Sequence, residues 1–364
     1  MHLSSAPPPM RGIVDILKGR EYFKKVKVLF DHPNPFLLAH GGFQTQIEQT
    51  KKALEANGVE MEWLRWWDDQ QKGDLIHYFG RPNPVYIRQA HAKGIKVVMS
   101  ELLTGLGSRS GMARKAQKTF MNIAKNALPH EFITRFSWEA YQTVDACIAL
   151  TSWEKELMVE MFSAEPERVH VVPNGVEEIF FSQEESKAEK SKYLVCTATI
   201  TERKRVVELA EAAIMAQVPV WIIGEPYSKE DPYYRKFLSV VRTAGEIVQY
   251  EGGISDRSRM ATIYQNALGF VLLSSRESQS LSALEASAGG CRLFLADLPW
   301  ARSSFGTMAT YSHLGSKEED AQNLKAFYQK IEKAPKPPSP CRWADVGKQM
   351  LKVYEELLPD KTSR

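Results

Sequence analysis

The stretch RESQSLSALEA at residues 276–286 follows the apolar run LGFVLL at residues 268–273. The apolar run predicts a buried strand, and the polar residues after it predict a turn that opens a helix. Glu277 falls in that turn, and Glu285 falls on the helix after seven intervening residues. Ser278 and Ser280 can cap the helix start, whose free N–H groups and positive dipole end favour an anion such as a diphosphate. Two carboxylates beside an anion site suggest a bound sugar nucleotide. Taken alone, the stretch is equally compatible with a strand–turn–helix unit that carries one solvated and one ordinary helical glutamate.

Length and composition limit the classes of protein. A chain of 364 residues suits two domains of roughly 170 residues each. With 43% hydrophobic and 25% charged residues and a net charge of +3, it has the composition of a globular protein and no signature of nucleic-acid binding. The four cysteines are widely spaced, and we expect reduced thiols. No apolar stretch reaches about 18 residues, so we expect a cytoplasmic protein, peripheral at the inner face of a membrane at most.

Strands and helices alternate twice along the chain. Strands are expected at 26–30, 59–64, 74–79, 95–100, 144–150 and 169–172, and again at 193–197, 218–223, 247–250 and 268–273. Such alternation predicts an α/β fold with two Rossmann-like, doubly wound parallel sheets and a ligand crevice at their carboxyl ends. We expect a disordered tail at 1–24, a first domain at 25–180, a linker at 181–192, a second domain at 193–340, and a C-terminal helix and tail at 341–364.

Three further segments carry candidate binding residues. Arg203 and Lys204 follow the first strand of the second domain, where two cations can neutralise a diphosphate, although a solvated basic pair is the plain alternative. Gly41 and Gly42 precede the first helix and can bare backbone amides toward the crevice, or form a simple turn. Asn174 lies in a Pro-Asn-Gly turn at the end of the first domain. A hinge turn with no role in binding is the simpler interpretation of this segment.

These segments together resemble retaining glycosyltransferases of the GT-B fold, most closely glycosyltransferase family four. The resemblance rests on the paired glutamates, on VVPNGV at 171–176 and on the loop at 196–204, and it extends from about residue 25 to 358. It implies that Glu277 contacts the donor sugar, Glu285 the ribose, and Ser280 and Leu281 the diphosphate. It also implies that Asn174 lies near the donor and that the C-terminal helix crosses back onto the first domain.

The chain departs from the family pattern at three places. Lys204 matches the lysine of the family loop, but the arginine's place falls at Ala198 or Thr199, so Arg203 would substitute from a different backbone position. Serine stands at 280 where the family usually has glycine. Glu101 follows the fourth strand in place of a histidine, and we expect it to contact a sugar or to be structural.

Other candidates carry less weight. His77 is more often a core residue than a catalyst at such a place in a strand, and the adjacent Asp68 and Asp69 are more often solvated than metal-bound. The segment 109–135 has six cations against one acid, with apolar residues interleaved. It predicts an amphipathic basic helix that contacts a membrane or a lipid-linked acceptor, or one that packs on the sheet with a solvated basic side.

We therefore expect a retaining hexosyltransferase that moves a sugar from a nucleotide-diphosphate donor to a glycan, lipid-linked or small-molecule acceptor, with no metal and no further cofactor. The alternatives are another GT-B activity, such as a sugar-nucleotide epimerase or a phosphorylase, and a non-catalytic sugar-nucleotide-binding protein.

Overall fold

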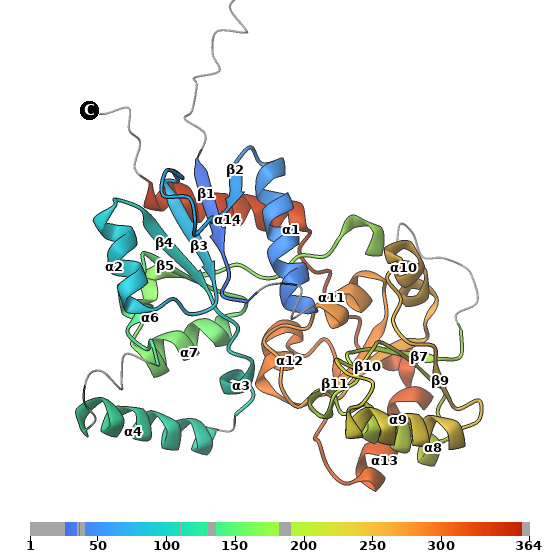
Figure 1. Ribbon diagram of the computed structural model, residues 1–364. Coiled ribbons are helices and arrows are strands. Elements are labelled where there is room, and N and C mark those ends of the chain that lie inside the picture. The colour runs from blue at the N-terminus through green and yellow to red at the C-terminus, as the bar shows by residue number, and fades with distance from the viewer. Residues whose placement is uncertain are drawn as a thin grey trace, which may run out of the picture.

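The chain folds into two α/β units, each built on a six-stranded parallel sheet (Figure 1). The computed structural model describes residues 26–34, 36, 41–109, 111–127, 129, 136–181 and 191–358. The expected N-terminal tail and most of the expected linker lie outside these residues. Two parallel sheets with surrounding helices confirm the predicted fold class.

The first sheet has the strand order β2-β1-β3-β4-β5-β6. All six strands predicted for this domain are present. The four inner strands are buried, mostly apolar runs, whereas the two edge strands are partly exposed. The strands are β1 (Lys27–Asp31), β2 (Glu60–Trp63), β3 (Leu75–Phe79), β4 (Lys96–Ser100), β5 (Ala146–Ala149) and β6 (Val169–Val171). The helices between them are α1 (Gly42–Ala56), α2 (Pro84–Ala92), α3 (Thr104–Gly107), α4 (Gly111–Ala127), α6 (Ala140–Thr143) and α7 (Ser152–Phe162).

The second sheet has the strand order β12-β11-β10-β7-β8-β9. Its strands are β7 (Leu194–Thr197), β8 (Val220–Ile223), β9 (Val248–Tyr250), β10 (Gly269–Leu272), β11 (Arg292–Ala296) and β12 (Thr310–Ser312). Its helices are α8 (Val206–Ala216), α9 (Pro232–Thr243), α10 (Arg257–Asn266), α11 (Leu281–Ala288), α12 (Pro299–Phe305) and α13 (Lys317–Gln329). The sequence predicted the first four strands, but β11 and β12 were not expected.

The C-terminal helix α14 (Trp343–Leu357) returns to the first domain and lies beside α1 (Figure 1). Close packing requires Gly347, since a Cβ atom there would lie 2.6 Å from the carbonyl oxygen of Ala53. Tyr354 donates or accepts a 2.6 Å hydrogen bond with Nδ1 of His77, whose Nε2 is 2.7 Å from Ser100 Oγ. These contacts confirm the predicted crossover of the C-terminal helix.

His77 lies inside β3 as a core residue, the interpretation that its place in a strand favoured. Its side chain is fully buried, and burial lowers the pKa of the imidazole to about 3. The ring is therefore neutral, and its two hydrogen bonds join β3, β4 and α14. The four cysteines are free thiols, and burial raises the pKa of Cys147 and Cys196 to about 12. Within the described ranges, no helix is both long and apolar enough to cross a bilayer.

Candidate active site between the two sheets

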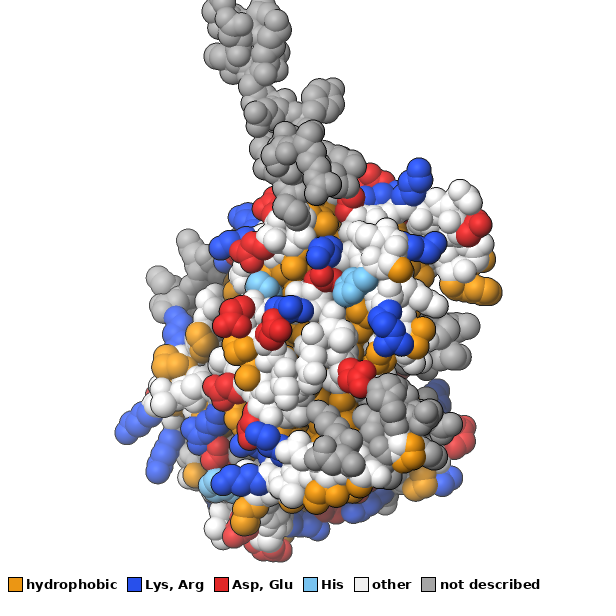
Figure 2. All heavy atoms as spheres, turned by 90° about the vertical axis from the view of Figure 1, so that its left-hand side faces the viewer, with side chains coloured by type: hydrophobic (Ala, Val, Ile, Leu, Met, Phe, Trp, Pro, Cys, Tyr) orange, Lys and Arg blue, Asp and Glu red, His pale blue; other side chains and the backbone are white. Residues whose placement is uncertain are grey.

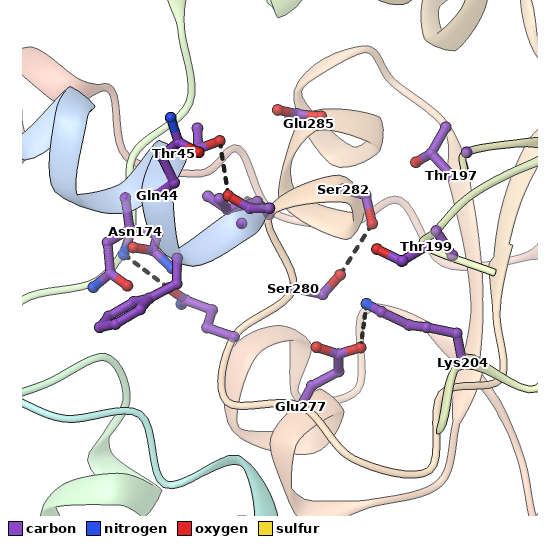
Figure 3. A pocket seen from close by; sticks show the side chains of 18 of the residues that line it. Gln44, Thr45, Asn174, Thr197, Thr199, Lys204, Glu277, Ser280, Ser282 and Glu285 are labelled. Atoms are coloured by element: carbon purple, nitrogen blue, oxygen red, sulfur yellow. Dashed lines mark hydrogen bonds and ion pairs between the residues drawn. The ribbon is translucent and has the colours of Figure 1, made fainter. Parts of the chain in front are cut away.

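A cavity of about 560 Å³ lies between the domains, at the carboxyl ends of the parallel strands. Figure 3 shows that residues of both domains point into it. Nine of the ten residues proposed from the sequence line this cavity: Gly41, Gly42, Asn174, Arg203, Lys204, Glu277, Ser280, Leu281 and Glu285. The topology brings them together because loops after parallel strands meet at one edge of a sheet.

Glu277 is buried, with 7% of its surface exposed, so the alternative of a solvated glutamate does not describe it. Lys204 Nζ donates a 2.5 Å hydrogen bond to Glu277 Oε1, and Arg203 Nη1 lies 3.1 Å from the same oxygen (Figure 3). Burial acts to raise the pKa of Glu277, but the charges of Lys204 and Arg203 outweigh it and hold the pKa below its ordinary value. The carboxylate is therefore ionised at neutral pH and points its charge into the cavity.

The cations reach Glu277 because their strands are neighbours. β7 pairs with β10, so the turn at Glu202–Lys204 that follows β7 lies against the loop that follows β10. The carbonyl of Arg203 accepts hydrogen bonds from the backbone N–H and the hydroxyl of Ser275, and its guanidinium donates to the carbonyl of Arg276 at 2.6 Å. The two loops are thus fixed to each other by backbone and side-chain contacts.

Two helix N-termini face the cavity. Ser280 caps α11 by accepting a hydrogen bond from the backbone N–H of Ala283, as predicted, whereas Ser278 contacts Thr104 of the first domain at 3.1 Å. Gly41 precedes α1 in the first domain. The start of α1 lies beside the start of α11, since a Cβ atom on Gly42 would lie 3.6 Å from the side chain of Leu281. Two positive dipole ends converge on this part of the cavity, which favours a bound anion.

Glu285 lies in the same cavity, on the side of Ser280 away from Glu277 (Figure 3). Arg257 donates to it at 2.6 Å, and Tyr264 donates at 3.4 Å. Burial raises the pKa of Glu285, and the charge of Arg257 opposes that rise only in part. Arg257 also pairs with Glu177 and so ties the carboxylate to the segment that links the domains.

Sequence reasoning missed Arg257. It is a single arginine at the first position of α10, and no neighbouring motif distinguishes it from the solvated arginine two residues later. Its role depends on a side-chain contact across helices.

Asn174 is buried at the domain junction, and its backbone N–H donates a 2.8 Å hydrogen bond to the side chain of Gln279. Its Oδ1 atom has no hydrogen-bond partner among the described residues. A buried acceptor without a partner is costly, so this oxygen is suited to receive a hydrogen bond from a ligand in the cavity.

Glu101 is not among the residues that line the cavity. Arg81 donates two hydrogen bonds to it, at 2.7 and 2.8 Å, and Tyr141 donates a third at 2.5 Å. Its carboxylate is committed to this cluster within the first domain. The sugar contact predicted from the sequence therefore has no support in the geometry, and the structural alternative accounts for the residue.

Ala198 and Thr199 line the cavity where the family arginine was expected. The guanidinium of Arg203 lies beside Glu277 instead, so the positive charge enters from the neighbouring turn. In the adjoining wall, the backbone at Gly224 approaches that of Ala198 closely. A Cβ atom on Gly224 would lie only 1.9 Å from the carbonyl oxygen of Ala198. Ile223, Ile254 and Met260 add apolar side chains to the lining of the cavity.

Metal ligands are not clustered in the described part of the chain, where no group of three or more His, Cys, Asp or Glu side chains is placed to hold an ion. The expected solvated pair Asp68 and Asp69 lies in the loop after β2, and Arg65 holds Asp68 through its Nε at 3.0 Å and Nη2 at 2.9 Å.

Comparison with known proteins supports the fold. Residues 59–178 match the sequence profile described as Glycosyltransferase Family 4. A glycosyltransferase from Rickettsia africae superposes with a TM-score of 0.65 at 12% identity, covering 94% of this chain and 100% of that one. A sucrose-phosphate synthase from Thermosynechococcus elongatus gives a TM-score of 0.66 at 14% identity, covering 92% and 99% of the two chains.

A third solved structure, the Anabaena protein HepE in complex with UDP and glucose, has a TM-score of 0.64 at 13% identity and covers 91% of this chain and 99% of that one. A search of curated proteins finds no significant match. The fold is the two-domain GT-B fold, shared with the solved glycosyltransferases to which the chain is similar. More particularly, the chain is similar to glycosyltransferase family four, whose profile its first domain matches.

Proposed function

We propose that the protein is a retaining glycosyltransferase that transfers a hexose from a nucleotide-diphosphate sugar to an acceptor hydroxyl. The observation that carries this proposal is the pair of buried carboxylates, Glu277 and Glu285, each held by cations within one cavity. Glu277 would accept hydrogen bonds from donor sugar hydroxyls, and Glu285 from the ribose. Lys204, Arg203 and the two helix N-termini would neutralise the diphosphate between them.

The ligands of one structural neighbour agree with this assignment. The HepE structure contains UDP and glucose, the two parts of a nucleotide-sugar donor. In the present cavity, apolar lining residues such as Ile223 and Ile254 would contact the base. The donor would then extend past Glu285 toward Glu277.

We expect retention because the chain resembles retaining glycosyltransferases. Among the described cavity residues no nucleophile is suitably placed, since Glu277 is bound by two cations, so we expect front-face attack and no covalent intermediate. The acceptor oxygen would form a bond to the anomeric carbon on the face from which the phosphate leaves. The bond between that carbon and the phosphate oxygen breaks, its electrons stay on the phosphate, and this oxygen takes the acceptor's proton. Positioning and charge stabilisation would then supply most of the rate.

The rival function is a non-catalytic sugar-nucleotide-binding protein, favoured by Ala198 and Thr199 in place of an arginine. A thermal-shift screen of nucleotide sugars identifies the donor, since a ligand at 100 times its dissociation constant adds about 2.7 kcal/mol of stability. The donor found this way is then incubated with enzyme alone. Slow release of free sugar supports a live catalytic centre, whereas binding without release supports the rival.

We predict that transfer requires no divalent metal. Lys204, Arg203 and the helix N-termini provide positive charge where a metal would otherwise be needed. Activity measured with excess EDTA should equal activity with added magnesium or manganese. Complete loss with EDTA and recovery with either metal would overturn this part of the proposal.

We further propose that α4 contacts an anionic membrane. Met112, Phe120 and Ile123 are 84%, 65% and 60% exposed on this helix, whereas Met121 and Ala124 are buried. The plain alternative, an apolar face packed on the sheet with only a basic side in solvent, does not describe these three residues. Lys115 and Lys118 lie on the same helix, and hydrophobic and basic side chains adjoin on this face of the molecule (Figure 2). Residues 130–135 of the predicted basic segment lie outside the described residues.

Vesicle sedimentation tests this contact. Attraction to an anionic surface is roughly 1 kcal/mol per basic residue and is screened over about 8 Å at physiological salt. Pelleting with phosphatidylserine vesicles should therefore fall at high salt and with neutral vesicles, and Phe120→Ser should weaken it. Met215→Ser, which changes an exposed residue of the second domain, serves as the control. Equal, negligible pelleting in all conditions would leave α4 a solvated helix.

A further inference from the structure

Two neighbouring tryptophans, Trp66 and Trp67, project from the first domain in the loop that follows β2. Their side chains are 84% and 67% exposed, and their ring centroids are 5.7 Å apart with the planes at 90°. Tryptophan gains most of its stabilising energy from burial, so two exposed rings in one loop are unusual in a structure that functions without a partner.

The loop that carries the rings is fixed by its own hydrogen bonds. Arg65 donates to Asp68 at 2.9 and 3.0 Å and to Glu62 at 2.8 Å. Gln71 donates to Glu62 at 2.8 Å and to the carbonyl of Trp63 at 3.0 Å, and its side-chain oxygen accepts from the backbone N–H of Arg65. The exposed rings are thus presented by an ordered turn, which lowers the entropic cost of binding.

An aromatic surface connects this loop to the cavity. Trp63, at the end of β2, packs against Phe36 with ring centroids 5.7 Å apart. Phe36 lies 5.7 Å from the ring of His32, which in turn lies 5.2 Å from Phe43. Phe36, His32 and Phe43 line the cavity on the side of the first domain, opposite the two glutamates of the second domain. The loop that carries the exposed tryptophans therefore begins beside the first-domain wall of the cavity.

The chemistry of the loop fits a neutral sugar better than a membrane. Residues 60–72 contain four acidic and two basic side chains, and this net negative charge opposes an anionic lipid surface. Asp69 and Gln70 are exposed next to the two rings and can bond hydroxyl groups. A pyranose offers both features at once, an apolar C–H face for an indole ring and hydroxyl groups at its edge.

We propose that Trp66 and Trp67 form an acceptor subsite that binds a distal sugar ring, so that the acceptor is an oligosaccharide or polysaccharide chain. This inference rests on the proposed glycosyl transfer and adds the class of acceptor. The chain end would lie in the cavity beside Glu277, and a sugar several units away would stack on the tryptophans. Binding at the loop itself does not require the donor.

Affinity electrophoresis in gels that contain glycogen, mannan, soluble β-glucan or glycol chitin tests the subsite on the full-length protein. At least one of these neutral polysaccharides should retard the wild type. Trp66→Ala and Trp67→Ala should each raise the apparent dissociation constant by about tenfold, the loss of one well-placed aromatic contact, while Trp67→Phe keeps most of the affinity. Met215→Ala is the matched control for an exposed apolar side chain outside this wall.

Two further measurements separate this proposal from the proposed function. Melting temperatures of the tryptophan variants should match the wild type, since the rings are exposed, and release of sugar from the donor without acceptor should be unchanged. No retardation by any of the four polysaccharides, with donor hydrolysis intact, would overturn the subsite alone. Tryptophan-dependent pelleting with lipid vesicles in place of polysaccharide binding would also overturn it and assign the loop to a membrane. If the wild type itself does not hydrolyse the donor, the catalytic proposal is refuted instead.

Discussion

Glu277→Ala is expected to lower the rate of sugar transfer about 100- to 1,000-fold, which corresponds to roughly 2.7–4 kcal/mol of lost transition-state stabilisation. The carboxylate is ionised, buried and directed into the cavity by two cations, so its hydrogen bonds to a donor sugar would form in a site of low dielectric. The measurement is kcat/KM for transfer with the donor identified by thermal shift.

The expected loss must be separated from a loss of structure. Removing Glu277 leaves Lys204 and Arg203 facing each other without their shared anion, which favours local rearrangement. Glu277→Gln keeps the shape of the side chain and its oxygen acceptor but removes the charge, so it should retain the fold and still lose most activity. Glu211→Ala removes a carboxylate from another Glu–Lys pair, that with Lys317 outside the cavity, and should keep full activity. Near-normal turnover in Glu277→Gln would remove this residue from the catalytic site.

Much of the first domain could be predicted from the sequence. Its four inner strands are buried, mostly apolar runs. Helices carry local start signals, such as Thr151, which accepts a hydrogen bond from the backbone of Glu154 at the start of α7. The gathering of Lys204, Glu277 and Glu285 also followed from strand order, since residues after parallel neighbouring strands share one edge.

Other features depended on contacts that no local pattern specifies. The strand β12 is three residues long and only partly apolar, so periodicity alone could not distinguish it from a loop. Glu101 occupies the expected position after β4, but Arg81 and Tyr141 from distant parts of the first domain engage its carboxylate. Arg257 shows the converse, because an ordinary helical arginine becomes the partner of Glu285 only once α10 and α11 pack together.

The structure also changes how the two cations of the site are interpreted. The sequence suggested a diphosphate as their partner, whereas in the present structure both face Glu277. One group of charges can serve both purposes, because a bound diphosphate would share the cations with the carboxylate. Donor binding would then loosen the ion pairs and leave Glu277 better able to accept hydrogen bonds from sugar hydroxyls.

Lys204→Ala is the second change for which we expect a large effect, a loss of about 100-fold in transfer rate, because it removes charge stabilisation of the leaving diphosphate. Calorimetry should show that a nucleoside diphosphate binds about tenfold more weakly, a change of about 1.4 kcal/mol, while the nucleoside alone binds as before. Lys317→Ala removes a lysine that pairs with Glu211 outside the cavity and provides the control. Equal losses for both ligands would show that Lys204 has only a structural role.

The pH dependence of the same variant provides an independent test. In the wild type, the charges of Lys204 and Arg203 hold the pKa of Glu277 below its ordinary value despite burial. Activity that needs the carboxylate should therefore fall only below the ordinary pKa of a glutamate. Without Lys204, burial still raises the pKa and less positive charge opposes it, so the acidic limb of the rate profile should move to higher pH. Lys204→Arg keeps the charge and should return the limb toward its wild-type position. An acidic limb that does not move in Lys204→Ala would show that Glu277 and Lys204 are not coupled during catalysis, contrary to the ion pair from which this site was inferred.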